Sequence, residues 1–252
     1  MRDAGTRRTR RQLTTLGVAF AVCTFLVAVV AERRTPGAGA PWGAVSAAGV
    51  LGVVGFARRH AHRNRPSERG RVFDSLGAAN AVTLCRGVVV AFLAGVLVVP
   101  APVGWLPALL YGAVAASDPV DGAIARLRDR TTLLGARLDV NVDAAGLLVA
   151  ALVGVSVGSL PPWYLAVGAA RYLFVLGAWR RRRRGLPVFE LPHGDTRRAL
   201  AGIQMAVTAV ALAPVVPQWA GWTLATVTML PFLGNFLVDW FVVTGRRERP
   251  LP

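Results

Sequence analysis

The 252-residue chain contains no lysine, so its 29 basic residues are all arginine, and only 13 acidic residues oppose them. Charged side chains make up 17% of the sequence, whereas a soluble domain has about a quarter. The net charge of +16 could indicate nucleic-acid binding, but arginine in a chain equally rich in Ala, Gly, Val and Pro is as well explained by a GC-rich genome. We therefore expect no nucleic-acid partner.

Cysteine is also scarce. Cys23 and Cys85 lie in apolar stretches and belong to no CxxC or Cys/His ligand spacing. The histidines at positions 60, 62 and 193 form no ligand set either. The sequence therefore predicts neither a disulfide framework nor a zinc site.

Apolar residues, in contrast, make up 54% of the chain and lie in blocks of roughly 20 residues, the length of a membrane-spanning helix. These blocks predict an all-α, polytopic membrane helix bundle. The first block has 19 residues and exceeds the apolar region of a signal peptide, roughly 7 to 15 residues, so we expect a retained helix. The eight candidate spans are residues 13–31, 42–57, 79–99, 103 to about 126, 133 to about 157, 163–179, 199–216 and 219–243.

The arginines orient these spans, because short cytoplasmic loops carry the excess of basic residues. Arginine clusters lie before the first span and at every second connection after it, whereas the connections near residues 100–102, 159–162 and 217–218 have none. Only Arg33 and Arg34 interrupt this alternation. We expect a multi-pass protein of the cell membrane with both termini in the cytoplasm.

Four aspartates, Asp118, Asp121, Asp139 and Asp143, lie within 26 residues at the expected cytoplasmic ends of two consecutive spans. An ionisable residue in a spanning helix is expensive and indicates function. The spacings of three and four residues place each pair on one helix face, and the short turn between the helices lets the two faces meet.

Four buried carboxylates cannot remain ionised without compensation. Two divalent cations would balance their summed charge, and ligation by oxygen alone suits Mg²⁺ or Mn²⁺. Such ions keep water or substrate phosphate as further ligands, which indicates a phosphate-bearing substrate with its site on the cytoplasmic side. The alternative is a set of ion pairs with Arg126 and Arg137.

The pattern around the aspartates, D-x2-D-G-x2-A-R-x8-G-x3-D-x3-D, begins at Asp118 and ends at Asp143. It resembles the signature of the CDP-alcohol phosphotransferase (CDP-alcohol phosphatidyltransferase) family at every fixed position. Upstream, Asn80 and Thr83 look like the family's N-x-x-T element. The resemblance covers roughly residues 80–243 and implies a six-helix core preceded by two additional transmembrane helices.

The resemblance also suggests how the chain is divided. The expected parts are an N-terminal extension with two transmembrane helices (1–57), a basic juxtamembrane segment (58–78), the CDP-alcohol phosphotransferase membrane domain (79–245) and a short cytoplasmic tail (246–252). The second part combines six arginines with the apolar residues Val72, Phe73 and Leu76, which indicates a segment on the inner membrane face or, alternatively, a solvated loop. Because the motif residues all follow Ala79, a chain beginning near Arg58 should retain activity if the extension is accessory.

Members of this family transfer a substituted phosphate from a CDP-alcohol to an acceptor hydroxyl and release CMP. The resemblance therefore implies a transferase of substituted phosphate groups that uses two Mg²⁺ or Mn²⁺ ions in phospholipid biosynthesis, and it allows a homodimer. The apolar bundle favours CDP-diacylglycerol as the donor. Inositol phosphate, glycerol phosphate, a sugar or amino alcohol and another lipid are all open as acceptors.

The resemblance assigns a role to each motif residue. Asp143 would ligate the second metal ion and act as the catalytic base that takes the proton of the acceptor hydroxyl. The remaining metal ligands would be Asp118, Asp121 and Asp139. The residues expected to contact the CDP-alcohol are Asn80, Thr83, Gly122, Ala125, Arg126, Thr132 and Gly135.

Four further residues need an interpretation. Arg171 interrupts a later span, so we expect it to bind the acceptor or a lipid phosphate. Asp239 is expected to pair with a nearby arginine and not to ligate metal. Two positions depart from the family's pattern: Pro119 can kink its helix, and Ala144 stands where many members carry arginine.

Two other functions would also place carboxylates in a membrane. A prenyltransferase of the UbiA type has two aspartate-rich motifs, but its N-x-x-x-D-x-x-x-D arrangement is absent here. A cation or proton-coupled transporter would hold its carboxylates near the bilayer midplane, whereas these lie at one edge. Release of CMP from a CDP-lipid would distinguish the three functions.

Overall fold

The structure, a computed structural model, describes residues 2–99, 103–127, 131–191 and 194–246, and the side chains of all of these except 2–3 and 118–127. These ranges form eight α-helices and three short 3₁₀ turns and contain no strand. The α-helices are α1 (Arg2–Arg34), α2 (Gly39–Arg59), α3 (Ala78–Gly95), α4 (Leu106–Leu127), α5 (Leu133–Ser156), α6 (Leu165–Arg183), α7 (Asp195–Ala211) and α8 (Gln218–Val243). Each of the eight apolar blocks is thus a helix, and the all-α fold is confirmed.

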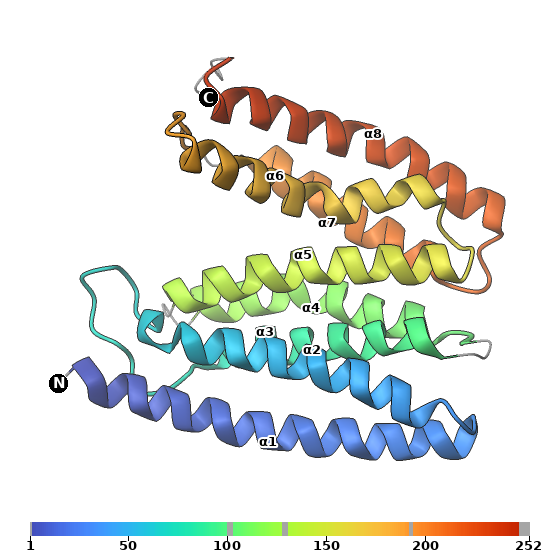
Figure 1. Cartoon of the computed structure of the whole chain (residues 1–252), viewed down its shortest axis with the longest axis horizontal. Coiled ribbons are helices and arrows are strands. Elements are labelled where there is room, and N and C mark those ends of the chain that lie inside the picture. Colours follow the sequence, from blue (N-terminus) through green and yellow to red (C-terminus); the bar gives the residue numbers. More distant parts are fainter. Residues whose placement is uncertain (1, 100–102, 128–130, 192–193, 247–252) are drawn as a thin grey trace.

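Successive helices run in opposite directions along one bundle, so that both ends of the chain lie at the same end of the molecule (Figure 1). The first two helices form one side of the bundle and the last three form the other (Figure 1). Between them, α3 packs against α2, α4 and α5, while α5 also contacts α6 and α4 also contacts α7. Helices α3 and α5 therefore occupy the centre of the fold.

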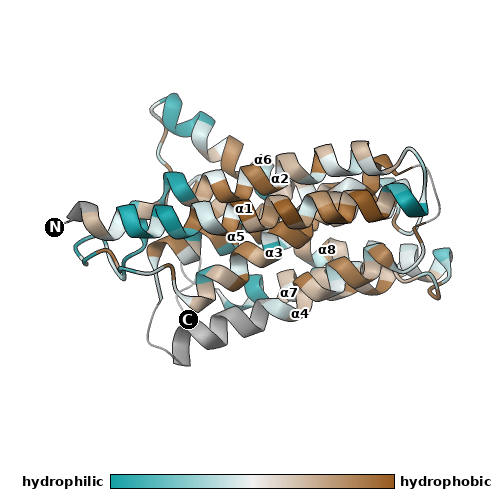
Figure 2. Ribbon diagram, turned by 90° about the horizontal axis from the view of Figure 1, so that it is seen from below, coloured by the Kyte–Doolittle hydropathy of each residue, from teal (hydrophilic) through white to brown (hydrophobic). Residues whose placement is uncertain are grey.

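An apolar core lies at the centre of the bundle. Leu84 and Leu93 of α3, Tyr111 of α4 and Leu134 and Leu138 of α5 are each at most 1% exposed and belong to one apolar core. Apolar residues also lie over much of the outside of the bundle, and the hydrophilic residues gather toward its ends (Figure 2). A surface of this kind requires lipid, not water, as its solvent.

Five helices are long and apolar enough to cross a membrane: α1, α2, α3 with the turn that follows it, α5 and α8. The apolar part of α4 is shorter and ends at Ser117. Arg171 interrupts α6, which ends in four arginines, and α7 has only 17 residues and begins with a charged turn. The structure therefore supports a membrane protein, and the full number of eight spans remains a prediction.

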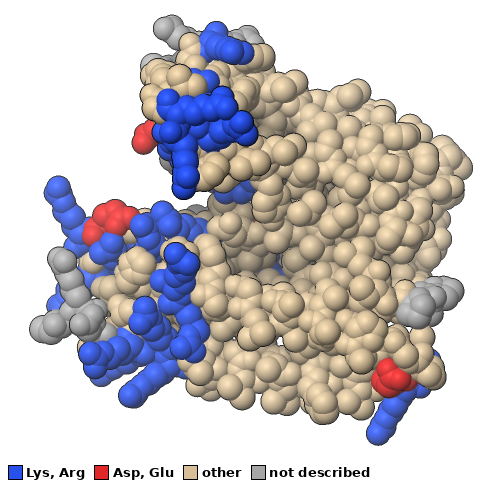
Figure 3. Space-filling model, in the orientation of Figure 1, with Lys and Arg blue, Asp and Glu red and all other residues tan. Residues whose placement is uncertain are grey.

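Arginine side chains gather over the end of the bundle at which the two termini lie (Figures 1 and 3). This distribution follows from clusters at alternate connections, because the helices alternate in direction. The exception seen in the sequence is also present, since Arg33 and Arg34 form the last turn of α1 at the opposite end. The arginine-rich end is the one that we expect to face the cytoplasm.

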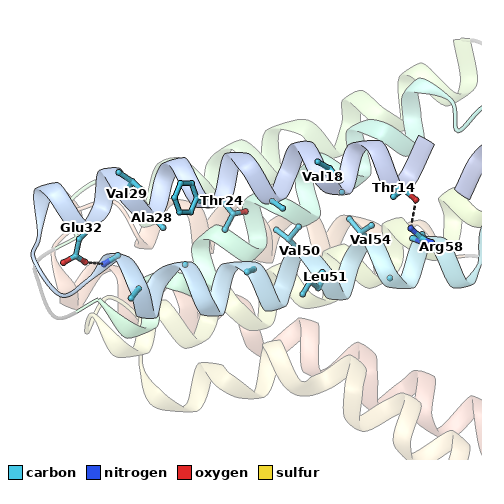
Figure 4. Close-up of a pocket in the computed structure, with 18 residues that line it drawn as sticks. Thr14, Val18, Thr24, Ala28, Val29, Glu32, Val50, Leu51, Val54 and Arg58 are labelled. Carbon is cyan, nitrogen blue, oxygen red and sulfur yellow. Dashed lines mark hydrogen bonds between the residues drawn. The ribbon is translucent and has the colours of Figure 1, made fainter. Parts of the chain in front are cut away.

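Helices α1 and α2 form a hairpin with an apolar groove of about 820 Å³ between them (Figure 4). At one end of the groove Arg58 donates a hydrogen bond to Thr14. At the other end the Glu32 carboxylate accepts from the backbone N–H groups of Gly37 and Gly39, both at 2.8 Å, and so closes the turn. The hairpin is not isolated from the rest of the bundle, because α2 lies along α3.

Candidate functional site

The described part of the candidate site centres on a buried arginine of α3. Arg86 is 2% exposed and donates from Nη1 to the Oδ1 atom of Asp139 at 2.9 Å. Its Nη2 atom donates to Oδ1 of Asp143, one turn further along α5. The four-residue spacing thus places both carboxylates on the side of α5 that faces α3, as the sequence predicts.

This arrangement bears on the alternative of ion pairs with Arg126 and Arg137, of which only Arg137 lies among the described side chains. Arg137, a partner considered for the aspartates, is exposed, and its carbonyl accepts a hydrogen bond from Asn141. Arg86 from the neighbouring helix pairs with Asp139 and Asp143. The sequence contained a signal for this role, because an arginine within an apolar span must find a partner.

The two aspartates of α4 lie outside the described side chains. Helix α4 is continuous through Asp118 and Asp121, so Pro119 does not interrupt it. Gly122, Ala125 and Arg126 belong to the same stretch and are also outside the described side chains. The meeting of the two aspartate pairs therefore remains a prediction.

Asp139 and Asp143, the described half of the site, offer the kind of ligand atoms that bind a divalent cation. Asp139 and Asp143 are 39% and 33% exposed, so their carboxylates remain accessible beside Arg86. Carboxylate oxygens are the ligands that Mg²⁺ and Mn²⁺ prefer. No group of three or more His, Cys, Asp or Glu residues suitable for a metal occurs among the described side chains, so a complete ligand set requires the aspartates of α4.

Four of the residues expected to contact the CDP-alcohol lie where α3 and α5 begin. Asn80, Thr83 and Thr132 are 4%, 3% and 7% exposed. Thr132 is the N-cap of α5, and its hydroxyl accepts a hydrogen bond from the N–H of Gly135 at 2.9 Å. The Asn80 amide donates to the same hydroxyl at 3.2 Å. These side chains fix the start of α5 against α3.

Gly135 is required by this contact. A Cβ atom at this position would lie 2.4 Å from Oδ1 of Asn80 and 3.1 Å from the Thr132 hydroxyl. A methyl group therefore cannot be placed without moving the amide. Contact of these four residues with a CDP-alcohol remains a prediction beside their structural role.

Arg171 lies close to the aspartates of α5. It borders a hollow of about 440 Å³ between α5 and α6, which Asn141, Ala144 and Trp179 also line. The surface is visibly indented between these helices toward the arginine-rich end (Figure 3). Asp143 is near enough to act electrostatically on Arg171.

Asp239 has the structural role that we expected. Its Oδ2 atom lies 3.7 Å from Nη1 of Arg197 and accepts a hydrogen bond from Asn235 at 3.2 Å. Asp239 is buried, whereas the arginine is partly exposed. The pair joins α7 to α8.

The fold is an all-helical bundle with several apolar spans, and a charged cluster lies between its central helices. These features are those of an integral membrane protein with a polar site inside the bundle. A family model described as CDP-alcohol phosphatidyltransferase matches residues 76–230, more than half of the chain. The chain belongs to this family, and the resemblance found in the sequence is confirmed. A comparison with curated proteins gives no match, and neither does a comparison with solved structures.

Membership carries several properties of the family to this chain. The family transfers substituted phosphate groups in phospholipid synthesis, from a CDP-alcohol to a hydroxyl, and generally uses divalent metal ions. Membership of this family therefore favours phosphotransfer over the two other functions considered, prenyl transfer and ion transport. The matched region begins just before α3 and ends within α8, so α1 and α2 lie outside it.

Proposed function

We propose that the protein transfers the phosphatidyl group of CDP-diacylglycerol to the hydroxyl of an acceptor and releases CMP. The observation that carries this proposal is the pairing of Asp139 and Asp143 with Arg86 inside the matched family region. The apolar surface of the bundle supports a lipid donor, because the acyl chains of CDP-diacylglycerol can remain in the bilayer while its diphosphate reaches the aspartates.

Asp118, Asp121, Asp139 and Asp143 would hold two Mg²⁺ or Mn²⁺ ions. When bound, these ions would neutralise the charge of the diphosphate and align the reacting groups. Arg86 has a separate role, since it holds the two carboxylates of α5 in one orientation. Without it, these like charges would separate.

The reaction exchanges one phosphorus–oxygen bond for another. The acceptor oxygen attacks the phosphorus that carries the diacylglycerol group, and Asp143 takes the proton of that hydroxyl. The bond from this phosphorus to the bridging oxygen breaks, and CMP leaves with the bridging oxygen. The products are CMP and an acceptor that carries the phosphatidyl group.

The donor and the acceptor would approach from different sides. Asn80, Thr83, Thr132 and Gly135, together with Gly122, Ala125 and Arg126 of α4, would form the CDP-alcohol end of the site. Arg171 would bind a phosphate of the acceptor or of a lipid, since it lies in the hollow beside Asp143. In the described part of the chain this guanidinium makes no hydrogen bond or ion pair, so it is available to an anion.

We further propose that the protein lies in the cell membrane, with the site and both termini on the cytoplasmic side. The gathering of arginines at that end supports this orientation (Figure 3). We propose the divisions at residues 57, 78 and 245 as functional boundaries, and a homodimer by analogy with the family.

The decisive experiment uses the purified protein with labelled CDP-diacylglycerol and a panel of acceptors: inositol phosphate, glycerol phosphate, a sugar, an amino alcohol and a lipid. Product mass and CMP are measured together. We expect equal amounts of CMP and one phosphatidyl product, both absent from an Asp139→Asn protein. If no acceptor yields CMP with the wild-type protein, the proposed function is wrong.

A further inference from the structure

A buried asparagine connects the N-terminal helix to the proposed site. Asn64 lies in the connection between α2 and α3, and its side chain is 0% exposed. Its Nδ2 atom donates to the hydroxyl of Thr9 on α1 at 3.2 Å and to the carbonyl of Ser75 at 2.8 Å. Thr9 is also 0% exposed. No apparent motif in the sequence marks either residue.

The other end of this side chain faces α3. Oδ1 of Asn64 accepts from the amide of Asn80 at 3.2 Å, and that amide also donates to the hydroxyl of Thr132 at the start of α5. A continuous chain of hydrogen bonds therefore runs from Thr9 through Asn64 and Asn80 to Thr132. We call these four residues the buried polar chain.

Backbone hydrogen bonds reinforce the same connection. The carbonyl of Arg65 accepts from the N–H of Leu133, in the first turn of α5, at 2.9 Å. The N–H of Leu76 donates to Gln12 of α1 at 2.8 Å. The first helix and the connection before α3 thus hold the starting points of both α3 and α5.

These starting points determine where the charged groups lie. Arg86 is six residues beyond Asn80 on α3, and Asp139 is one turn beyond Gly135 on α5. A shift of either helix start would move Arg86 relative to the aspartates. Buried polar groups are costly to leave unpaired, so the buried polar chain resists such a shift.

We propose that Thr9 and Asn64 are positioning residues for the CDP-alcohol end of the site, and that α1 is therefore a working part of the enzyme. This inference rests on the proposed function. The two residues act through Asn80 and Thr132 and do not touch the donor. The N-terminal extension is then not accessory, although it lies outside the matched family region.

The packing of α1 supports this conclusion. Leu13, one turn beyond Thr9, is 0% exposed and belongs to the same apolar core as Leu84 and Leu134. Removal of the first 57 residues would open this core and leave Asn64 without Thr9. We therefore expect that a chain beginning near Arg58 fails to retain full activity.

The test compares two threonines of the same helix in the full-length protein. Thr9→Val removes the hydroxyl that Asn64 uses. Thr24→Val is the matched control, because Thr24 is 3% exposed and its hydroxyl donates only to the carbonyl of Phe20 within α1. Thr9→Ser keeps the hydroxyl and serves as the conservative variant. Donor KM, kcat and the thermal unfolding midpoint are measured for each protein with CDP-diacylglycerol.

We expect Thr9→Val to raise the donor KM about 3- to 10-fold, the effect of losing one hydrogen bond between neutral groups. Thr9→Ser and Thr24→Val should have a donor KM within about 2-fold of the wild-type value, a smaller change than the loss of one such hydrogen bond would cause. Asn64→Ala, which removes contacts to both α1 and α3, should raise the KM further. Thr9→Val should unfold at a lower temperature than Thr24→Val, because it leaves the buried Asn64 amide short of an acceptor. KM is therefore compared well below both unfolding midpoints, where every variant is folded and a change of KM reports on positioning.

Equal donor KM values for Thr9→Val and Thr24→Val in an active enzyme would overturn the positioning role and leave the proposed function standing. Absence of CMP release from the wild-type protein would overturn both. If Asn64→Ala does not fold, the comparison of Thr9→Val with Thr9→Ser still decides the question.

Discussion

Arg86 carries a full positive charge into the interior of a helix bundle, and the ion pairs described for it are with two aspartates of one neighbouring helix. A guanidinium that has lost its water needs such partners, and the two carboxylates would repel each other without it. Within this group of three, however, negative charge exceeds positive charge. The group therefore favours a further cation beside it.

The first prediction concerns this arginine. Arg86→Met should lower the free energy of unfolding by about 1–3 kcal/mol, less than for a fully buried pair because the carboxylates are partly exposed. Mg²⁺ should restore part of the loss, since it supplies the missing charge. Thermal unfolding in detergent, with and without Mg²⁺, measures both effects. Arg86→Lys keeps the charge and is the control; an unchanged midpoint for Arg86→Met would contradict the prediction.

A second prediction separates the aspartates by role. Asp143→Asn should lower transfer about 10²- to 10⁴-fold, the usual contribution of a general base, while donor affinity remains appreciable. Asp121→Asn should lose both, because it removes a predicted metal ligand. Direct binding of CDP-diacylglycerol in Mg²⁺ and CMP release give the two quantities. If Asp143→Asn binds the donor as poorly as Asp121→Asn does, its role is metal ligation and not proton transfer.

At the scale of elements, the start of α5 is the point where several requirements meet. Thr132 caps the helix, Gly135 leaves room for the Asn80 amide, and the aspartates follow on the same helix. A helix can be shifted or rotated as a unit, so a small change at its first turn reaches every residue beyond it. The first turn of α5 is therefore a sensitive point of the fold.

The third prediction tests that sensitivity. Gly135→Ala should lower both the unfolding midpoint and the donor affinity, although alanine favours a helix over glycine by about 1 kcal/mol. The added Cβ would lie too close to Oδ1 of Asn80 and would push the Asn80 amide out of its place. Gly202→Ala in α7 is the control, because no atom lies within 4 Å of its new Cβ; it should be neutral or stabilising. Stabilisation by Gly135→Ala would show that the amide moves without penalty.

The sequence predicted each helix because long apolar runs mark the parts of the chain that leave water. It missed the polar ends of several helices: α1 begins at Arg2, α2 ends at Arg59 and α6 ends at Arg183, each beyond the expected apolar span. Arginine favours helix almost as well as leucine does, so the polar ends continue the helices. Hydropathy detects only the apolar portion.

The site was predictable only where spacing along one helix determines geometry. Asp139 and Asp143 share a face because they are four residues apart. The link between Thr9 and Asn64 joins residues 55 positions apart through an irregular connection, and no periodic pattern encodes such a contact. Arg86 lies between these cases, since its burial in an apolar span was visible but its partner was not.

At the scale of the whole molecule, charge is distributed unevenly along the bundle, with arginines concentrated at the end where the termini lie (Figure 3). The predicted metal-binding aspartates precede and follow the connection between α4 and α5 near that end. A phosphate-bearing substrate approaching from this side would meet positive charge before it meets the aspartates. The arrangement favours anionic donors and acceptors.

The fourth prediction is removal of metal from the intact protein. EDTA should abolish CMP release, and Mg²⁺ or Mn²⁺ should restore it. The metal should also stabilise the fold, by about 2.7 kcal/mol at a concentration 100 times its Kd. Activity and the unfolding midpoint are followed in one titration, with Asp139→Asn as the control that should show a weaker shift. Full transfer in metal-free buffer would contradict the proposed role of the aspartates.

The buried polar chain also has a consequence for biosynthesis. Its links join residues 55, 16 and 52 positions apart, from Thr9 to Asn64, then to Asn80 and finally to Thr132. A ribosome completes α1 and α2 long before it reaches Thr132. Thr9 and Asn64 can pair as soon as the connection after α2 has been made, whereas the link from Asn80 to Thr132 waits until α3, α4 and the start of α5 are complete. The donor end is therefore assembled in two stages, and its N-terminal half is present before α5 arrives.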